Sequence, residues 1–163
     1  MMIAKHFLVV ATLLLSACAA AEASPIVFLV RHAEKAASGG NDPDLSTAGQ
    51  EQAESLARML KDAEITAIFT TEFKRTRETA APTAKATKIS PTVVPANDIP
   101  AMVEKLRSLK GNALVVTHGN TIPDLVKALG IETPITIPDD DYSELLVIIL
   151  ADKPQLLRLH YPT

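Results

Sequence analysis

Two apolar segments dominate the hydrophobic pattern of the chain, and each is followed by residues that can do chemistry. Ile26–Val30 is apolar throughout, and Arg31 and His32 follow it at once. Ala113–Thr117 repeats the arrangement downstream and is followed by His118. Short apolar runs of this kind are typical of central strands that are covered on both faces. Because ligands of open α/β sheets bind beyond the carboxyl ends of the strands, the pattern predicts one site shared by both histidines.

Helical and extended patterns alternate through the rest of the chain. Thr47, with Gln50 three residues later, is the predicted N-cap of the first helix, and Pro82 predicts a kink or break in the second. The predicted helices are Thr47–Lys61, Lys74–Ala86, Ile99–Leu109 and Pro123–Leu129, and the further strands are Thr66–Thr70, Thr92–Val94, Glu144–Leu150 and Gln155–His160.

This alternation predicts an α/β domain with three layers, α/β/α, around a mostly parallel sheet. The last two predicted strands are close enough in sequence to form a hairpin, which makes the sheet mixed. Neither an internal repeat nor a linker divides the segment, so we assign residues 25–163 to one domain.

Composition narrows the classes of function. Of the 163 residues, 47% are hydrophobic and 21% are charged, which is ordinary for one globular domain with a core. The formal net charge is −3, so we expect no broad basic surface for nucleic acid. Aromatic residues make up 4% and tryptophan is absent from the sequence, which argues against base-stacking platforms. An anionic ligand therefore has to be held by a local cluster of cations.

Residues 1–24 have the pattern of a targeting segment. Lys5 and His6 precede the apolar run Phe7–Leu15, and small residues follow, which is the order found in secretory signals. The apolar run is shorter than the roughly 20 residues needed to span a bilayer. We therefore expect an exported protein of a bacterial envelope.

Two cleavage sites remain open in this segment. Leu15-Ser16-Ala17-Cys18 resembles the lipobox of bacterial lipoproteins, in which the cysteine is lipidated, whereas Ala21-Glu22-Ala23 suits ordinary signal peptidase. Cys18 is the one cysteine of the sequence, so a disulfide within the chain is excluded. The expected location is the periplasm, with membrane attachment only through a lipid anchor at Cys18.

Three cationic segments stand just after predicted strands. They contain Arg31 with His32, Arg75, and His118. Converging guanidinium groups match phosphate oxygens bidentately, and a histidine ring nitrogen among them can act as a nucleophile. Cations around a transferring phosphoryl group neutralise its oxygens, which is where catalysis of phosphoryl transfer mostly acts.

Four motifs, in their order along the chain, resemble those of one enzyme family. They are Arg31-His32-Ala33-Glu34, Leu45-Ser46-Thr47-Ala48-Gly49-Gln50-Glu51-Gln52-Ala53, Thr71-x-x-x-Arg75-x-x-x-Thr79-Ala80, and Thr117-His118-Gly119-Asn120. Together they resemble the histidine phosphatase superfamily, the phosphoglycerate-mutase-like group (branch 1) with its R-H-G/A signature. The resemblance extends over nearly all of the chain after Pro25.

The resemblance implies a role for each matching residue. His32 would be the nucleophile and carry a transient phosphohistidine, while Arg31, Arg75 and His118 would bind the phosphoryl oxygens. His118 would do so either as a cation or through a ring N–H. Gly119 and Asn120, at the start of the following helix, would add phosphate contacts. The family implies no cofactor and no metal, and no cluster of His, Cys and carboxylates in the sequence has metal-ligand spacing.

The general acid is the open point of the assignment. Family members usually place a Glu or Asp downstream of the second arginine, where this chain has Asp98. Asp98 can equally be the N-cap of the helix that follows, a position that Asp favours. Glu34 is a second candidate, although it can also orient Arg31 or stay solvated. We interpret the remaining polar residues that stand out as surface or structural, namely Lys35, Arg77, Asp139–Asp141 and His160.

The predicted function is hydrolysis of phosphomonoesters through a phosphohistidine on His32. The short domain leaves little room for insertions, so we expect an open site for varied small phosphate esters or a phosphoprotein. Two alternatives remain: a compact phosphohistidine protein phosphatase, and an envelope protein that binds phosphate or phosphorylated ligands without catalysis.

Overall fold

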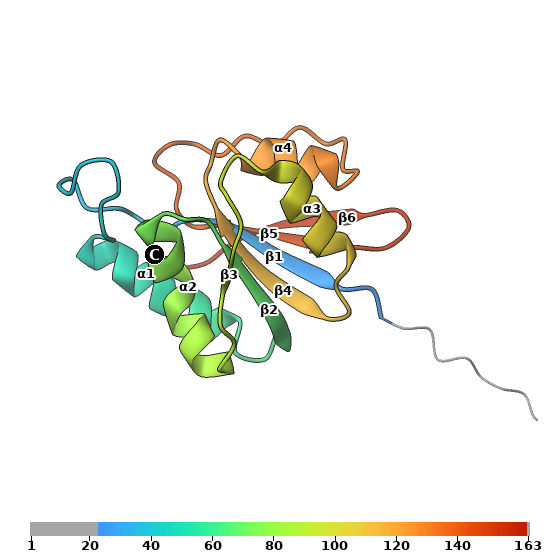
Figure 1. The fold of residues 1–163 in the computed structure, drawn as a ribbon, viewed down its shortest axis with the longest axis horizontal. Helices are drawn as coiled ribbons and strands as arrows, with labels where there is room; N and C mark the ends of the chain where they lie inside the picture. The colour runs from blue at the N-terminus through green and yellow to red at the C-terminus, as the bar shows by residue number, and fades with distance from the viewer. Residues whose placement is uncertain (1–22, 163) are drawn as a thin grey trace, which may run out of the picture.

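The computed structural model describes residues 23–162, which form a mixed six-stranded sheet between two pairs of helices (Figure 1). The elements, in chain order, are β1 Ile26–Arg31, α1 Thr47–Met59, β2 Ile65–Thr70, α2 Lys74–Thr87, β3 Thr92–Val93, α3 Ile99–Arg107, β4 Asn112–Thr117, α4 Ile122–Ala128, β5 Glu144–Ile149 and β6 Gln155–His160. The predicted lipidation residue Cys18 and most of the predicted signal segment lie outside the described residues. None of the helices within residues 23–162 has the length and apolar character needed to cross a membrane.

The sheet brings the carboxyl ends of three strands to one edge. The strand order is β3-β2-β4-β1-β5-β6, in which β1, β2, β3 and β4 run parallel. The register of the central pair places Arg31 opposite Thr117. β5 pairs antiparallel with both β1 and β6, so the predicted mixed sheet and its closing hairpin are confirmed. The residues that follow β1, β2 and β4 therefore meet at the same edge.

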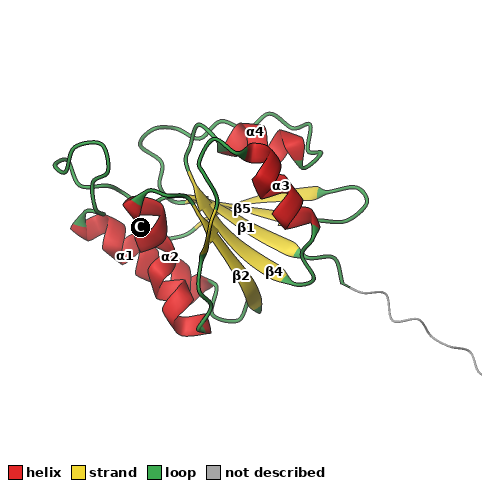
Figure 2. Cartoon of the chain, in the orientation of Figure 1, coloured by secondary structure: helices red, strands yellow, loops and turns green. Residues whose placement is uncertain are grey.

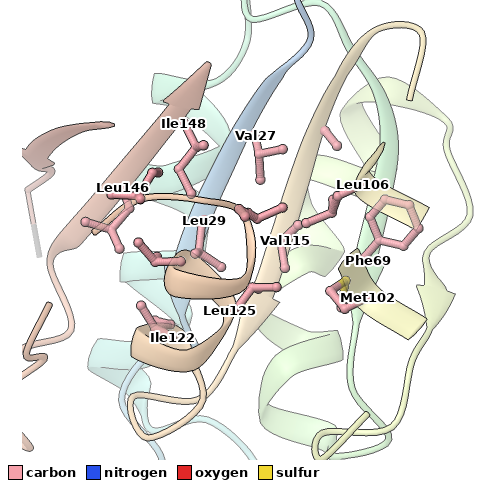
Figure 3. Packing of buried hydrophobic residues seen from close by; sticks show 14 of the residues in the cluster. Val27, Leu29, Phe69, Met102, Leu106, Val115, Ile122, Leu125, Leu146 and Ile148 are labelled. Atoms are coloured by element: carbon pink, nitrogen blue, oxygen red, sulfur yellow. The ribbon is translucent and has the colours of Figure 1, made fainter. Parts of the chain in front are cut away.

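Two apolar cores hold the layers together. α1 and α2 cover one face of the sheet, and α3 and α4 cover the other (Figures 1 and 2). Side chains of α3 and α4, such as Met102 and Leu125, pack on Val27, Leu29 and Val115 of the central strands (Figure 3). The opposite face of the same strands packs on α1 and α2 through a separate cluster: Val30, Leu56, Leu60, Ala80, Leu114 and Val116. Both faces of β1 and β4 are thus covered, which explains their uninterrupted apolar sequences.

The beginning of α1 differs from the prediction. Ser46, not Thr47, is the N-cap, and its hydroxyl oxygen accepts a hydrogen bond from the Gly49 N–H at 3.0 Å. The Ser46 hydroxyl also donates to the Glu34 carboxylate, which lies in the turn after β1. The predicted N-cap was wrong by one residue because Ser and Thr are adjacent and both are good caps.

Pro82 does not break α2, which runs without interruption from Lys74 to Thr87. The helix buries Thr76, Thr79, Ala80 and Thr83 along one side. Packing of this side against the sheet and α1 keeps the helix continuous in spite of the backbone hydrogen bond that a proline cannot make.

The Ser46 cap can be tested against its neighbour. We expect Ser46→Ala to lower the free energy of unfolding by about 1–2 kcal/mol, because the first turn of α1 loses its cap and Glu34 loses a donor. Thr47→Ala, one residue on and exposed, should change it by less than about 0.5 kcal/mol. Urea denaturation of the two variants makes the comparison, and an equal loss in both would contradict the assignment of Ser46.

Candidate active site

The site lies where β1, β4 and β2 end. The His32 N–H donates to the Thr117 carbonyl at 2.9 Å, which extends the pairing of β1 and β4 by one residue. The rings of His32 and His118 lie 5.4 Å apart, centroid to centroid, in an edge-to-face arrangement. Arg75, in the first turn of α2, brings Nη2 to 3.5 Å from Nδ1 of His118. The structure therefore brings together the histidines and arginines that the sequence singled out.

His32 is held in the form that a nucleophile needs. Its side chain is buried, and Nδ1 lies 2.8 Å from the carbonyl oxygen of Ala33, which can only accept a hydrogen bond. Nδ1 therefore carries the proton, and Nε2 has a free lone pair. Burial lowers the pKa of His32 from 6.5 to about 4; the charges of His118, Arg75 and Arg31 act in the same direction, and the Ala33 bond opposes them. The ring is neutral at pH 7.

The charged form of His118 is disfavoured as well. Burial, followed by the charge of Arg75, lowers the pKa of His118 from 6.5 to about 4, while the charge of Glu72 opposes the shift. Because the Arg75 guanidinium can only donate, Nδ1 of His118 accepts, and Nε2 carries the proton. That Nε2–H faces the hydroxyl oxygen of Thr71 at 3.0 Å.

The guanidinium group of Arg75 is fixed from three sides. Nη2 faces His118, Nη1 lies 3.7 Å from a carboxylate oxygen of Asp42, and the guanidinium carbon lies 4.3 Å from the ring centre of Phe73. Nε of Arg75 is buried, and no group within residues 23–162 accepts a hydrogen bond from it. A buried N–H is usually paired in folded proteins, so this donor is available to a water molecule or to a bound anion.

Arg31 is held by a loop that the sequence did not connect with the site. Its Nη1 donates to the carbonyl oxygens of Pro138, Asp139 and Asp141 at 2.9, 2.8 and 3.3 Å, and its guanidinium carbon lies 4.3 Å from the ring centre of Tyr142. Its Nε is buried and, like that of Arg75, has no acceptor among the described residues.

The interpretation of Asp139–Asp141 as a solvated loop was incomplete, because the backbone of this loop binds Arg31. Side-chain types do not reveal contacts made by main-chain carbonyls, so the sequence contained no signal for this role. The loop also brings Tyr142 to His32, at 6.1 Å between the ring centres.

Gly119 and Asn120 take different positions around the phosphate-binding side chains. A Cβ atom on Gly119 would lie 3.5 Å from Cδ of Arg31, so Gly119 packs directly against the Arg31 side chain. Asn120 lines a small pocket beside Arg75 and His118. Both residues therefore adjoin the site that the sequence predicted for them.

The two predicted candidates for the general acid both have structural partners. Asp98 is the N-cap of α3, and its Oδ1 accepts from the Ala101 N–H at 3.0 Å. Glu34 accepts a hydrogen bond from the Ser46 hydroxyl at the beginning of α1. Arg77 is exposed, and His160, also exposed, lies 3.6 Å from Asp141. The structure thus gives each of these side chains a capping or surface position.

A pocket of about 260 Å³ adjoins the site, and its lining comprises Phe73, Arg75, Ala96, Asn97, His118, Asn120 and Thr121. A larger cavity of about 830 Å³ lies elsewhere, between α1 and α2, and its lining contains neither of the two site histidines nor the two site arginines. We assign the site by its chemistry and not by cavity size. Among residues 23–162, no three His, Cys, Asp or Glu side chains gather as metal ligands would.

Comparison with known proteins gives a family match over part of the chain. The sequence model of the histidine phosphatase superfamily (branch 1) matches residues 27–97. A search of curated proteins found no match.

Several solved structures share the fold. The protein histidine phosphatase SixA complexed with tungstate has a TM-score of 0.69 at 21% identity, over 83% of this chain and 96% of that one. A SixA-type putative phosphohistidine phosphatase from Agrobacterium tumefaciens has a TM-score of 0.65 at 21% identity, over 83% of this chain and 98% of that one. A mycobacterial glucosyl-3-phosphoglycerate phosphatase has a TM-score of 0.67 at 16% identity, over 85% of this chain and 100% of that one.

The two buried histidines should make stability depend on pH. Between pH 6.5 and about 4, the unfolded chain binds protons on these rings that the folded protein does not bind. The free energy of unfolding should therefore fall as the pH drops through this window, by about 1.4 kcal/mol per pH unit for each fully buried ring at most. Urea denaturation at several pH values measures the slope.

The double variant His32→Asn, His118→Asn should flatten this slope, whereas His160→Asn, which changes an exposed ring, should leave it in place. An unchanged slope in the double variant would assign the pH dependence to other groups.

Proposed function

We propose that the chain is a phosphatase of the histidine phosphatase superfamily (branch 1), whose sequence model matches residues 27–97, and that it hydrolyses phosphomonoesters through a phosphohistidine on His32. The observation that carries this proposal is the pair of buried arginine Nε groups without an acceptor among the described residues, beside a histidine with a free Nε2. Two unpaired donors on permanently charged groups suit an anion, and the guanidinium fork suits phosphate in particular.

The geometry supports a two-step displacement. Nε2 of His32 attacks phosphorus with its lone pair, the bond from phosphorus to the leaving oxygen breaks, and that oxygen takes up a proton. Water then attacks the phosphohistidine, the P–N bond breaks, and phosphate is released. Arg31 and Arg75 stabilise the oxygens of the phosphoryl group in both steps, as electrostatic catalysis of phosphoryl transfer requires.

His118 supports the same chemistry by changing its protonation. A phosphate dianion beside this ring favours the charged imidazolium form, because opposite charges attract. The added proton would sit on Nδ1, which in this structure faces Arg75. His118 would then donate to a phosphoryl oxygen, and the neutral ring seen here is the form that awaits substrate.

A second candidate is hydrolysis of phosphohistidine in a protein substrate. Asp98 caps α3 and Glu34 accepts from the Ser46 hydroxyl, so both acids expected from the sequence have structural partners. A phosphohistidine needs less assistance than an alcohol ester, because its leaving group is an imidazole. The SixA structures that share the fold are described as phosphohistidine phosphatases. The export proposed below argues against this substrate class.

The nucleophile is tested by His32→Ala in the folded domain. We expect the wild-type protein to hydrolyse p-nitrophenyl phosphate with EDTA present, and the variant to lose at least about 1,000-fold in kcat, because no phosphohistidine can form. His160→Ala is the matched control and should retain activity. Acid-labile phosphate on the wild-type protein, trapped by rapid denaturation, would identify the intermediate.

The same two proteins distinguish the candidate substrate classes when they are given a phosphoserine peptide and a phosphohistidine peptide. Turnover of the ester supports the first candidate, and turnover of phosphohistidine alone supports the second. Tight phosphate binding without turnover of any substrate would indicate a binding protein and contradict both.

For the location, we propose export directed by residues 1–24, with lipidation at Cys18. The basis is the sequence pattern alone. We expect Cys18→Ser to release the protein from bacterial membranes into the periplasmic fraction, because the thiol is the acceptor of the lipid. Fractionation and mass spectrometry of the mature amino terminus measure this. Membrane association that survives the substitution would contradict the anchor, and cleavage after Ala23 in the wild-type protein would contradict lipidation.

A further inference from the structure

Glu72 lies beside His118 and takes no part in the functions assigned so far. The residue before it, Thr71, places its hydroxyl 3.0 Å from Nε2 of His118. The residue after it, Phe73, packs edge-to-face against the His118 ring with 5.2 Å between ring centres. One contact on each side of Glu72 therefore holds its backbone against His118, the second histidine of the site.

The Glu72 carboxylate reaches the loop after β3. Its Oε2 accepts a hydrogen bond from the Ala96 N–H at 2.9 Å. Ala96 lines the 260 Å³ pocket together with Arg75 and His118. This loop also contains Asp98, at the position where the family resemblance led us to expect the acid. Glu72 thus brings a carboxylate to this loop from the segment between β2 and α2.

The pocket adjoins two of the groups proposed to bind the phosphoryl oxygens. Arg75 and His118 line it, whereas His32 does not. In-line displacement places the leaving oxygen on the side of phosphorus opposite the nucleophile. We expect a leaving group that points away from His32 to enter this pocket. The Glu72 carboxylate is exposed and lies at the rim of the pocket, where it is bonded to Ala96.

We propose that Glu72 is the general acid that protonates the leaving oxygen, an inference that rests on the proposed phosphatase function. When the bond from phosphorus to oxygen breaks, the protonated carboxyl group gives its proton to the leaving oxygen. The carboxylate then regains a proton from solvent before the next turnover. The negative charge of Glu72 already acts on His118, which agrees with their proximity.

Glu72→Gln tests the proposal on two classes of ester. The amide oxygen can still accept from the Ala96 N–H, so the local structure should be retained. We expect kcat to fall about 100-fold on an alkyl phosphate, whose alkoxide is a poor leaving group, because general acid catalysis contributes about 100-fold or more. On p-nitrophenyl phosphate, whose phenolate leaves without a proton, the fall should be less than about 3-fold.

Asp98→Asn is the matched control, since it neutralises a carboxylate in the same loop and Asn still caps a helix well. It should lower both rates by less than about 2-fold. Equal losses on both esters in Glu72→Gln would show that Glu72 only positions His118. A loss confined to the alkyl phosphate in Asp98→Asn would assign the acid to Asp98. Either result overturns the proposal.

Failure of the proposed function gives a different result. A wild-type protein that hydrolyses neither ester contradicts the proposed ester hydrolysis itself. A wild-type protein that hydrolyses p-nitrophenyl phosphate but no alkyl phosphate retains the phosphatase function and rules out a general acid at Glu72.

Discussion

The parallel pairing of β1 with β4 is the interaction on which the site depends. It places Arg31 opposite Thr117, and the His32 N–H continues the pairing to the Thr117 carbonyl. A shift of one residue would turn the side chains of β1 to the opposite faces of the sheet, exchanging the two apolar cores. Because both strands are covered on both faces, the cores allow one register. The same packing that stabilises the sheet therefore sets the 5.4 Å between the two histidine rings.

Crowding of cationic side chains in one place has an energetic consequence. Burial and the neighbouring arginines disfavour protonation of both histidines, and the pKa of each falls to about 4. The protein then has two neutral rings and two charged arginines where an anion is to bind. The arginine charges are partly balanced within the chain, by Asp42 beside Arg75 and by the carbonyl oxygens of Pro138 and Asp139 around Arg31. Each guanidinium still keeps a buried Nε without an acceptor among residues 23–162.

Much of this could be predicted from the sequence because the informative signals are local. Apolar strands ending in Arg31-His32 and in His118 predicted a shared site, and the alternation of strands and helices predicted the mixed sheet. The contacts that the prediction missed are made by backbone atoms or decided by tertiary packing. The carbonyl oxygens of Pro138 and Asp139 have no sequence signal, and the choice between Ser46 and Thr47 as N-cap depends on the position of Glu34.

The carboxylates show why sequence spacing alone could not assign an acid. Asp98 lies where the family resemblance led us to expect the acid. A residue just before a helix can also serve as its N-cap, and the structure shows Asp98 capping α3. Glu72 precedes the second arginine, so the family resemblance did not single it out. It reaches the same loop as Asp98 because β2 and β3 are neighbours in the sheet. The packing of strands and loops decides which backbone N–H each carboxyl group at this edge binds. It thereby decides which carboxyl group lies beside the pocket.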